Sequence, residues 1–125
     1  MATDDRLLPV ALLLVAGAAG ATGRWLVSLG LPGRPGTLAA NVAGAALLGL
    51  LVTRALSLRG ASGRVELFAV TGFCSSFTTY STFALGAFTA LPWPGAGYVL
   101  VTYALGLAAA WLGRAAARRR WGRSG

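Results

Sequence analysis

Four long apolar stretches, separated by short polar and turn-forming clusters, dominate the pattern of this chain. Each stretch is close to the roughly 20 apolar residues that a helix needs to cross a membrane. Clusters rich in Gly, Pro and Ser at 30–36, 57–63 and 92–95 separate the stretches. The pattern therefore predicts an all-α membrane protein with four spanning helices, at about 7–29, 37–56, 65–91 and 96–112.

The composition supports a membrane protein and leaves little room for another domain. Of the 125 residues, 56% are hydrophobic and 11% are charged, whereas a soluble domain carries about 25% charged residues. Four spans nearly exhaust the chain, so we expect residues 1–125 to form one transmembrane domain with a basic tail at 114–125. We expect a multi-pass protein of the cell membrane, in contact with the lipid bilayer.

The first apolar stretch has an alternative interpretation as a cleaved signal peptide, because it ends in a run of small residues near Ala21. However, Asp4 and Asp5 precede it with a single Arg6, and the apolar run continues to Val27. A first spanning helix is therefore the better interpretation.

Small residues recur four positions apart, a spacing that lets helix backbones approach closely in lipid. We expect these residues to pack helices together and to carry no chemistry. The pairs are Ala16 and Gly20, Ala40 and Gly44, Ala45 and Gly49, and Gly106 and Ala110.

The charged residues narrow the possible functions. The net charge is +8, and all basic residues are arginines at span ends or in the tail, which fits membrane topology better than binding to nucleic acid. The chain has one cysteine, Cys74, three acidic residues and no histidine. The usual catalytic triads and metal clusters cannot be built from these side chains, so we expect neither an enzyme nor a nucleic-acid partner.

The third stretch is unusual because its middle is polar. Six Ser and Thr side chains fall within residues 75–82, although no charged residue occurs between Glu66 and Arg114. Ser and Thr bond nearby backbone groups instead of supporting a regular helix, and an unpaired polar group in hydrocarbon is costly. We therefore predict that this helix is broken near its middle, between Ser75 and Thr78. Carbonyls freed by such a break can hold a monovalent cation.

Two polar residues outside this run each have two interpretations. Asn41, the one amide within the spans, either joins helices by hydrogen bonds or binds a ligand, and Thr37 lies one turn before it on the same face. Arg24 is either an arginine that extends to the membrane surface or a functional cation. Neither residue alone decides between these roles.

Aromatic and hydroxyl residues form two further patterns. Tyr80 and Phe83 lie three positions apart, and such residues are by themselves more often packing aromatics than a ligand site. Tyr98 and Thr102 share a face of the last helix, which Gly106 continues.

Three motifs taken together are far more specific than any single residue. They are Gly-Ala-Thr-Gly-Arg24-Trp, Gly36-Thr-Leu-Ala-Ala-Asn41-Val-Ala-Gly44, and Gly72-Phe-Cys followed by Thr78-Thr-Tyr-Ser-Thr-Phe83. Their order and spacing resemble the CrcB/Fluc family of fluoride channels over nearly the whole chain, and Trp111-Leu-Gly113 also resembles the family pattern. The resemblance implies a fluoride-selective channel that exports cytoplasmic fluoride passively and relieves its toxicity. It also implies an antiparallel, dual-topology dimer of four-helix subunits, with two pores along the interface.

The resemblance further implies roles for individual residues. Asn41 matches the pore asparagine of the family, Tyr80 and Phe83 match its paired pore phenylalanines, and Arg24 matches its first-helix arginine. The family has a structural sodium ion at the centre of the dimer, held by backbone carbonyls, which here would belong to Ser75 and Thr78. The other residues of the fluoride pore would be Thr37, Thr79, Ser81, Tyr98 and Thr102.

The chemistry of fluoride agrees with these residues. Fluoride is small and tightly hydrated, so a pore must replace its water with hydrogen-bond donors, such as Asn41 and the hydroxyls of Thr79, Ser81 and Thr102. Aromatic edges carry partial positive charge and can face an anion. A fixed side-chain cation would bind the anion too tightly for release.

Three positions depart from the family pattern. Tyr80 stands where phenylalanine is usual, Ser75-Ser76 replaces a typical Gly-Gly, and Gly106 stands where a serine is common. The departures concern the pore, the backbone around the sodium site and the polar face of the last helix.

The arginines also predict topology and assembly. Nine lie on the side shared by the N-terminus, the second loop and the C-terminus, and two lie on the opposite side. The positive-inside rule then places both termini in the cytoplasm. An antiparallel homodimer needs nearly equal insertion both ways, so we expect this chain to pair with a homologous subunit of opposite bias. The nine are Arg6, Arg54, Arg59, Arg64, Arg114, Arg118, Arg119, Arg120 and Arg123, and the two are Arg24 and Arg34.

Two other functions were weighed against a fluoride channel. A small dual-topology multidrug/proton transporter needs a membrane-embedded carboxylate to exchange protons, and this chain has none deep within a span. A non-transporting membrane scaffold would not need a polar third segment.

Overall fold

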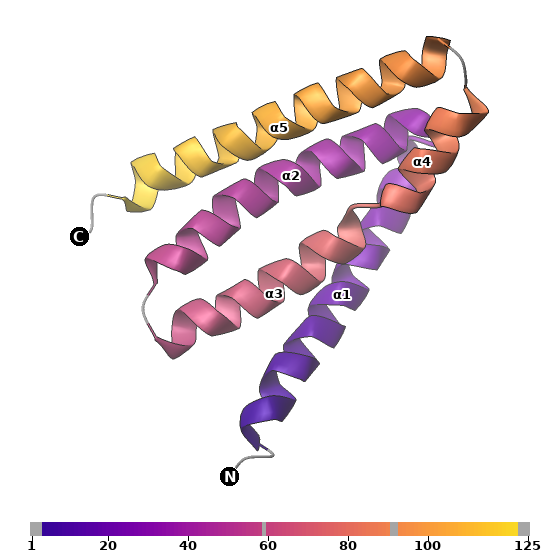
Figure 1. The fold of residues 1–125 in the computed structure, drawn as a ribbon. Coiled ribbons are helices and arrows are strands. Elements are labelled where there is room, and N and C mark those ends of the chain that lie inside the picture. The colour runs from indigo at the N-terminus through magenta and orange to yellow at the C-terminus, as the bar shows by residue number, and fades with distance from the viewer. Residues whose placement is uncertain (1–3, 59, 91–92, 123–125) are drawn as a thin grey trace.

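Five helices make up the described part of the chain. The structure, a computed structural model, describes residues 4–58, 60–90 and 93–122, and no strand occurs among them. This confirms the predicted all-helical fold. In chain order the helices are α1 (Asp4–Gly30), α2 (Arg34–Ser57), α3 (Ala61–Phe77), α4 (Tyr80–Thr89) and α5 (Trp93–Trp121), drawn in Figure 1.

Three of the helices can cross a membrane by length and composition: Arg6–Gly30, Arg34–Ser57 and Trp93–Trp121. At most 22% of the most apolar window in each is buried within the chain. Large apolar side chains instead face outward, as Leu14 does at 68% exposure and Leu107 at 71%. Such a surface is stable in contact with lipid, which is the property of a multi-pass membrane protein.

The third predicted span consists of α3 and α4, which are bent relative to each other (Figure 1). Between them, Thr78 (φ −80°, ψ 157°) and Thr79 (φ −146°, ψ 119°) are extended. Ser75, which the sequence placed at the start of a break, still lies inside α3.

Hydroxyl groups bond to the backbone at the end of α3 and at the start of α4. The Thr78 hydroxyl donates to the Cys74 carbonyl over 2.8 Å, and the Thr79 hydroxyl accepts from the backbone N–H of Thr82 over 3.3 Å. The second bond is an N-cap of α4. The first leaves the helical bond from the Thr78 N–H to the Cys74 carbonyl in place, at 3.0 Å. α3 ends where the next N–H, that of Thr79, donates to Asn41 instead of to the helix. The expected bonding of Ser and Thr to the nearby backbone is thus confirmed.

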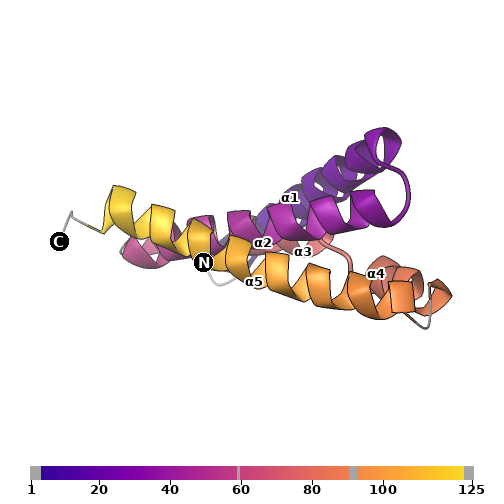
Figure 2. The ribbon, with the colours of Figure 1, turned by 90° about the horizontal axis from the view of Figure 1, so that it is seen from above.

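The interruption lets the third segment change its neighbours. α3 packs against α1 and α2, whereas α4 packs against α5 and the start of α2. In both views α1 and α5 lie on opposite sides of α2 (Figures 1 and 2). Because α3 and α5 make no contact, one side of α2 is left uncovered between them.

The connections lie at two opposite ends of the molecule. The start of α1, the end of α2 and the end of α5 are at one end, and the ends of α1 and α4 are at the other (Figure 1). This is the arrangement expected of four crossings. Arg59, Leu91, Pro92 and Arg123, which the sequence assigned to loops, a span end or the topology count, lie outside the described residues.

The last helix is longer than the sequence predicted. The expected limit was residue 112 with a tail from 114, but α5 continues through the basic run to Trp121. Alanine and arginine are strong helix formers, and cations in the last turn favour the helix dipole. Ala117 is 1% exposed, and the Arg54 guanidinium lies 5.1 Å from the centroid of the Trp121 ring, so the end of α5 is held by packing.

The first turn of α2 also lies in a predicted turn. α2 begins at Arg34, inside the cluster at 30–36, with Pro35 in its first turn. Proline is tolerated there because its missing N–H has no partner in a helix anyway. Gly33 precedes it at φ 76°, a left-handed conformation that favours glycine.

Three of the glycines pack closely against a neighbouring helix, as the sequence predicts. A methyl group added at Gly20 would meet the Phe73 carbonyl, one at Gly49 the Ala110 carbonyl, and one at Gly44 the Thr78 side chain. These glycines therefore set the separation of the helices. The prediction is wrong for Gly106, where nothing lies within 4 Å of the added carbon.

Gly49 and Gly106 provide a matched pair for testing this packing. We expect Gly106→Ala to raise the free energy of unfolding by up to about 1 kcal/mol, the difference in helix propensity. Gly49→Ala should lower it by about 1–3 kcal/mol, because α2 and α5 must separate. Equilibrium unfolding in detergent measures both, and equal effects of the two changes would contradict the packing described.

Candidate functional site

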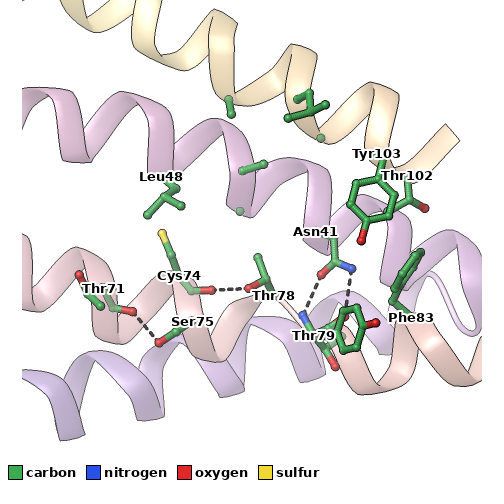
Figure 3. A pocket seen from close by; sticks show the side chains of 16 residues that line it. Asn41, Leu48, Thr71, Cys74, Ser75, Thr78, Thr79, Phe83, Thr102 and Tyr103 are labelled. Atoms are coloured by element: carbon green, nitrogen blue, oxygen red, sulfur yellow. Dashed lines mark hydrogen bonds between the residues drawn. The ribbon is translucent and has the colours of Figure 1, made fainter. Parts of the chain in front are cut away.

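The uncovered side of α2 forms a cavity of about 550 Å³ between α3 and α5, next to the start of α4 (Figure 3). No charged side chain lines it. Seven of the residues singled out from the sequence do: Asn41, Ser75, Thr78, Thr79, Tyr80, Phe83 and Thr102.

Asn41 connects α2 to the interruption in the third segment. Its Oδ1 accepts from the N–H of Thr79 over 2.8 Å, and its Nδ2 donates to the carbonyl of Thr79 over 3.1 Å (Figure 3). One carboxamide thus satisfies both backbone groups of an extended residue that lies outside any helix. The interhelical interpretation of Asn41 is therefore confirmed. Its second amide hydrogen has no partner among the described residues, so it can still donate.

The hydrogen bond from Thr79 to Asn41 also affects the end of α3, because it leaves a carbonyl there without its helical donor. In a continuing helix the N–H of Thr79 would donate to the Ser75 carbonyl, but it donates to Asn41 instead. Thr78 lies between the two helices. Backbone carbonyl oxygens that lack a helical donor are suited to binding a hard monovalent cation. Among the described residues, no cluster of three or more His, Cys, Asp or Glu side chains could hold a metal ion.

Arg24 contacts the same helix end from α1. Its Nε donates to the Ser76 carbonyl over 3.3 Å. A cation at the C-terminus of a helix stabilises carbonyls that lack a helical donor. Arg24 does not line the cavity, so its observed contact is structural.

Phe83 is the centre of an aromatic cluster. It is 7% exposed, and its ring centroid lies 5.8 Å from that of Tyr80, 5.4 Å from Tyr98 and 5.9 Å from Tyr103. The Tyr103 ring meets it edge to face at 85°. Tyr80 differs sharply, since it is 74% exposed. The two aromatics that the sequence paired therefore occupy different environments.

Most hydroxyl protons near the cavity are already used. Thr102 donates to the Tyr98 carbonyl over 2.7 Å, and Thr79 donates to the Thr82 hydroxyl over 3.2 Å. The Ser81 hydroxyl lies 3.4 Å from that of Thr79. A hydroxyl has one proton, so these groups must exchange an existing bond to donate to an anion.

Three predicted pore residues lie outside the cavity lining: Thr37, Ser81 and Tyr98. Thr37 is buried and donates to the Gly33 carbonyl over 3.3 Å. The Tyr98 hydroxyl is buried without a hydrogen-bond partner among the described residues. It is therefore a donor whose proton is not already used.

Sequence reasoning missed Tyr103. It lines the cavity with Leu107 and Ala110, and Figure 3 shows it at the end of the cavity occupied by Asn41 and Phe83. Residues spaced by four and three share one helix face, so the spacing 103, 107, 110 was a usable signal.

Residues 11–114 match the family described as CrcB-like protein, Camphor Resistance (CrcB). The chain belongs to the CrcB family. Among its CrcB relatives is fluoride-specific ion channel FluC 1 of Haloarcula marismortui, which is 42% identical over 94% of both chains. FluC 1 of Natronomonas pharaonis is 46% identical over 90% of this chain and 98% of its own. FluC 2 of Halobacterium salinarum is 44% identical over 86% of this chain and 84% of its own.

The contact between Asn41 and Thr79 predicts a stability difference in this CrcB chain. Asn41→Ala leaves a backbone N–H and a carbonyl unpaired and should lower the free energy of unfolding by about 1–3 kcal/mol. Asn41→Asp should also destabilise, because a carboxylate oxygen would face the Thr79 carbonyl. Unfolding in detergent measures both changes.

Thr22→Ala is the control, since that hydroxyl bonds only within α1, to the Ala18 carbonyl over 2.8 Å. It should change the free energy of unfolding by less than about 0.5 kcal/mol. If Asn41→Ala had no larger effect than Thr22→Ala, Asn41 would not hold the interruption in place.

Proposed function

We propose that this chain is a subunit of a fluoride-selective channel that exports fluoride passively across the cell membrane. The observation that carries the proposal is the match, over nearly the full length, to relatives named fluoride-specific ion channels. The cavity beside the interruption is the proposed fluoride path. This is transport, so no catalytic step is assigned to the chain.

The lining of the cavity suits weak anion binding. It offers the free amide hydrogen of Asn41, exchangeable hydroxyls and the aromatic edges around Phe83, with no charged group. Donors and ring edges replace part of the hydration of fluoride. Without a cation in the path, the ion can also leave, as conduction requires.

The residues outside the cavity form a second part of the proposed path. Thr37, Ser81 and Tyr98 lie near the start of α2 and on α4 and α5, and the unpaired Tyr98 hydroxyl is the available donor among them. A path that passes from one set to the other must pass Phe83, because its ring contacts both Tyr98 and Tyr103.

The carbonyls of Ser75 and Thr78 would hold the sodium ion of the proposed assembly. The diversion of the Thr79 N–H to Asn41 supports this, since it removes the helical donor of the Ser75 carbonyl. When bound, the ion would supply positive field near the path without entering it. Arg24, through the Ser76 carbonyl, would hold the same helix end in position.

The cavity is open on one side, so a second subunit is needed to enclose a pore. We propose an antiparallel partner, with four crossings in each subunit and the third crossing formed by α3 and α4. The arginine bias favours a homologous partner of opposite orientation over a second copy. Both termini of this chain would then lie in the cytoplasm.

A proton-coupled transporter is less well supported. It requires a carboxylate within the membrane, whereas Glu66 lies near the start of α3 and pairs with Arg54 at 3.2 Å. A scaffold without transport would not account for a cavity whose lining includes an amide and several hydroxyl groups.

Fluoride efflux from liposomes tests the function. Protein reconstituted with its partner, where one is required, should release fluoride and not chloride under a potassium-driven voltage. Phe83→Ile should lower the flux at least about tenfold, because an aromatic edge is replaced by an apolar group. Phe68→Ile is the matched control, since Phe68 lies on α3 outside the cavity. Equal fluoride and chloride flux would exclude selectivity, and equal effects of the two variants would exclude Phe83 from the path.

Reporter fusions at the C-terminus test the topology. Expressed alone, the chain should give a cytoplasmic signal from a fluorescent protein and almost none from periplasmic alkaline phosphatase. Replacing Arg118, Arg119 and Arg120 by glutamine should raise the periplasmic signal, because it reduces the excess of arginines on the side of the chain that holds both termini. Equal cytoplasmic and periplasmic signals from the unmodified chain would instead favour a dual-topology homodimer.

A further inference from the structure

A second groove, of about 830 Å³, lies between α2 and α5 toward the end that carries most of the arginines. Leu48 and Ala110 line both this groove and the cavity described above. Its walls are mainly apolar, with Val52 and Leu56 on α2 and Trp111 on α5. Arg114 and Arg118, four residues apart on α5, complete it.

The position of these arginines along α5 matches the lipid headgroups. α5 has 29 residues, which corresponds to about 43 Å of helix, whereas the hydrocarbon core is about 30 Å thick. The helix is therefore longer than the core. Arg118 is in its last turn, and Arg114 lies one turn earlier. An arginine one turn inside the boundary extends its charge toward the headgroups.

The charge of the groove has no acidic partner among the described side chains. The single ion pair among them is Arg54 with Glu66, at 3.2 Å, so Glu66, the one acidic side chain that the structure describes, is already paired. Arg114 and Arg118 are both exposed and have no acidic partner in the described part of the chain. The groove thus combines apolar walls with two free positive charges at one end.

We propose that this groove binds an anionic phospholipid of the bilayer. The lipid phosphate bonds Arg114 and Arg118, and an acyl chain lies along Val52, Leu56 and Trp111. Basic pockets between transmembrane helices bind anionic headgroups in this way. Free phosphate would leave the apolar walls uncovered. A second copy of this chain would cover the walls but brings no unpaired acidic group among its described side chains.

Lipid retention and thermal stability test this proposal. The purified chain, in detergent micelles at physiological ionic strength, is titrated with phosphatidylglycerol or with phosphatidylcholine of identical chains. We expect phosphatidylglycerol to raise the unfolding temperature and to stay bound in native mass spectrometry, and phosphatidylcholine to do neither. Arg114→Gln with Arg118→Gln should weaken phosphatidylglycerol binding by about 25-fold, at roughly fivefold for each basic residue.

Two control variants distinguish lipid binding in the groove from attraction by positive charge alone. Arg64→Gln with Arg119→Gln removes the same charge from the same end, but neither residue lines the groove, so binding should stay close to that of the unmodified chain. Val52→Trp keeps every arginine but fills the groove, and it should reduce lipid retention.

Several results would overturn the proposal. One is equal phosphatidylglycerol binding by the unmodified chain and the Arg114/Arg118 variant. Another is an equal loss in the Arg64/Arg119 control, which would indicate diffuse attraction. A thermal shift reproduced by inorganic phosphate would assign the arginines to a soluble anion. A change in oligomeric mass without any lipid effect would assign the face to a protein partner. None of these readouts depends on fluoride flux.

Discussion

The paired hydrogen bonds between Asn41 and Thr79 are the interaction on which the rest of the site depends. A peptide group outside a helix is unstable in hydrocarbon unless the protein satisfies it. The carboxamide of Asn41 has the same donor and acceptor as a peptide group, and it bonds both the N–H and the carbonyl of Thr79. Because Asn41 is on α2, the interruption is fixed relative to that helix. α4 can then leave α3 and pack against α5, which opens the cavity.

Only some of the polar groups that line the cavity are free to donate a hydrogen bond. Serine and threonine satisfy themselves by bonding backbone carbonyls within their own helices, as Ser75, Thr78 and Thr102 do. This makes the polar run compatible with lipid without a bound solute. It also means that the number of hydroxyls overstates the capacity to solvate an anion. Within the lining, the second amide hydrogen of Asn41 and the hydroxyls of Tyr80 and Tyr103 are free to donate. The buried Tyr98 hydroxyl lies outside the lining.

Features set by local sequence could be predicted, and features set by contacts between distant segments could not. The apolar stretches, the hydroxyl bonds near Thr78 and the close approach at Gly49 follow from composition and spacing over a few residues. The length of α5 depends on contact between Arg54 and Trp121, and the role of Tyr103 depends on where α4 turns. Gly106 has the spacing of a packing residue, but it faces the cavity and no described atom lies within 4 Å of a carbon added there.

The order of segments along the chain has a consequence for biosynthesis. A chain is made from its N-terminus, so α2 enters the membrane before the interruption leaves the ribosome. α3 and α4, with 17 and 10 residues, are each shorter than the roughly 20 residues that favour insertion on their own. In the proposed topology with four crossings, the amide that satisfies Thr79 would therefore already be in the bilayer when α3 and α4 arrive. α2 would then act as an internal template for the insertion of a segment whose two helices are each short.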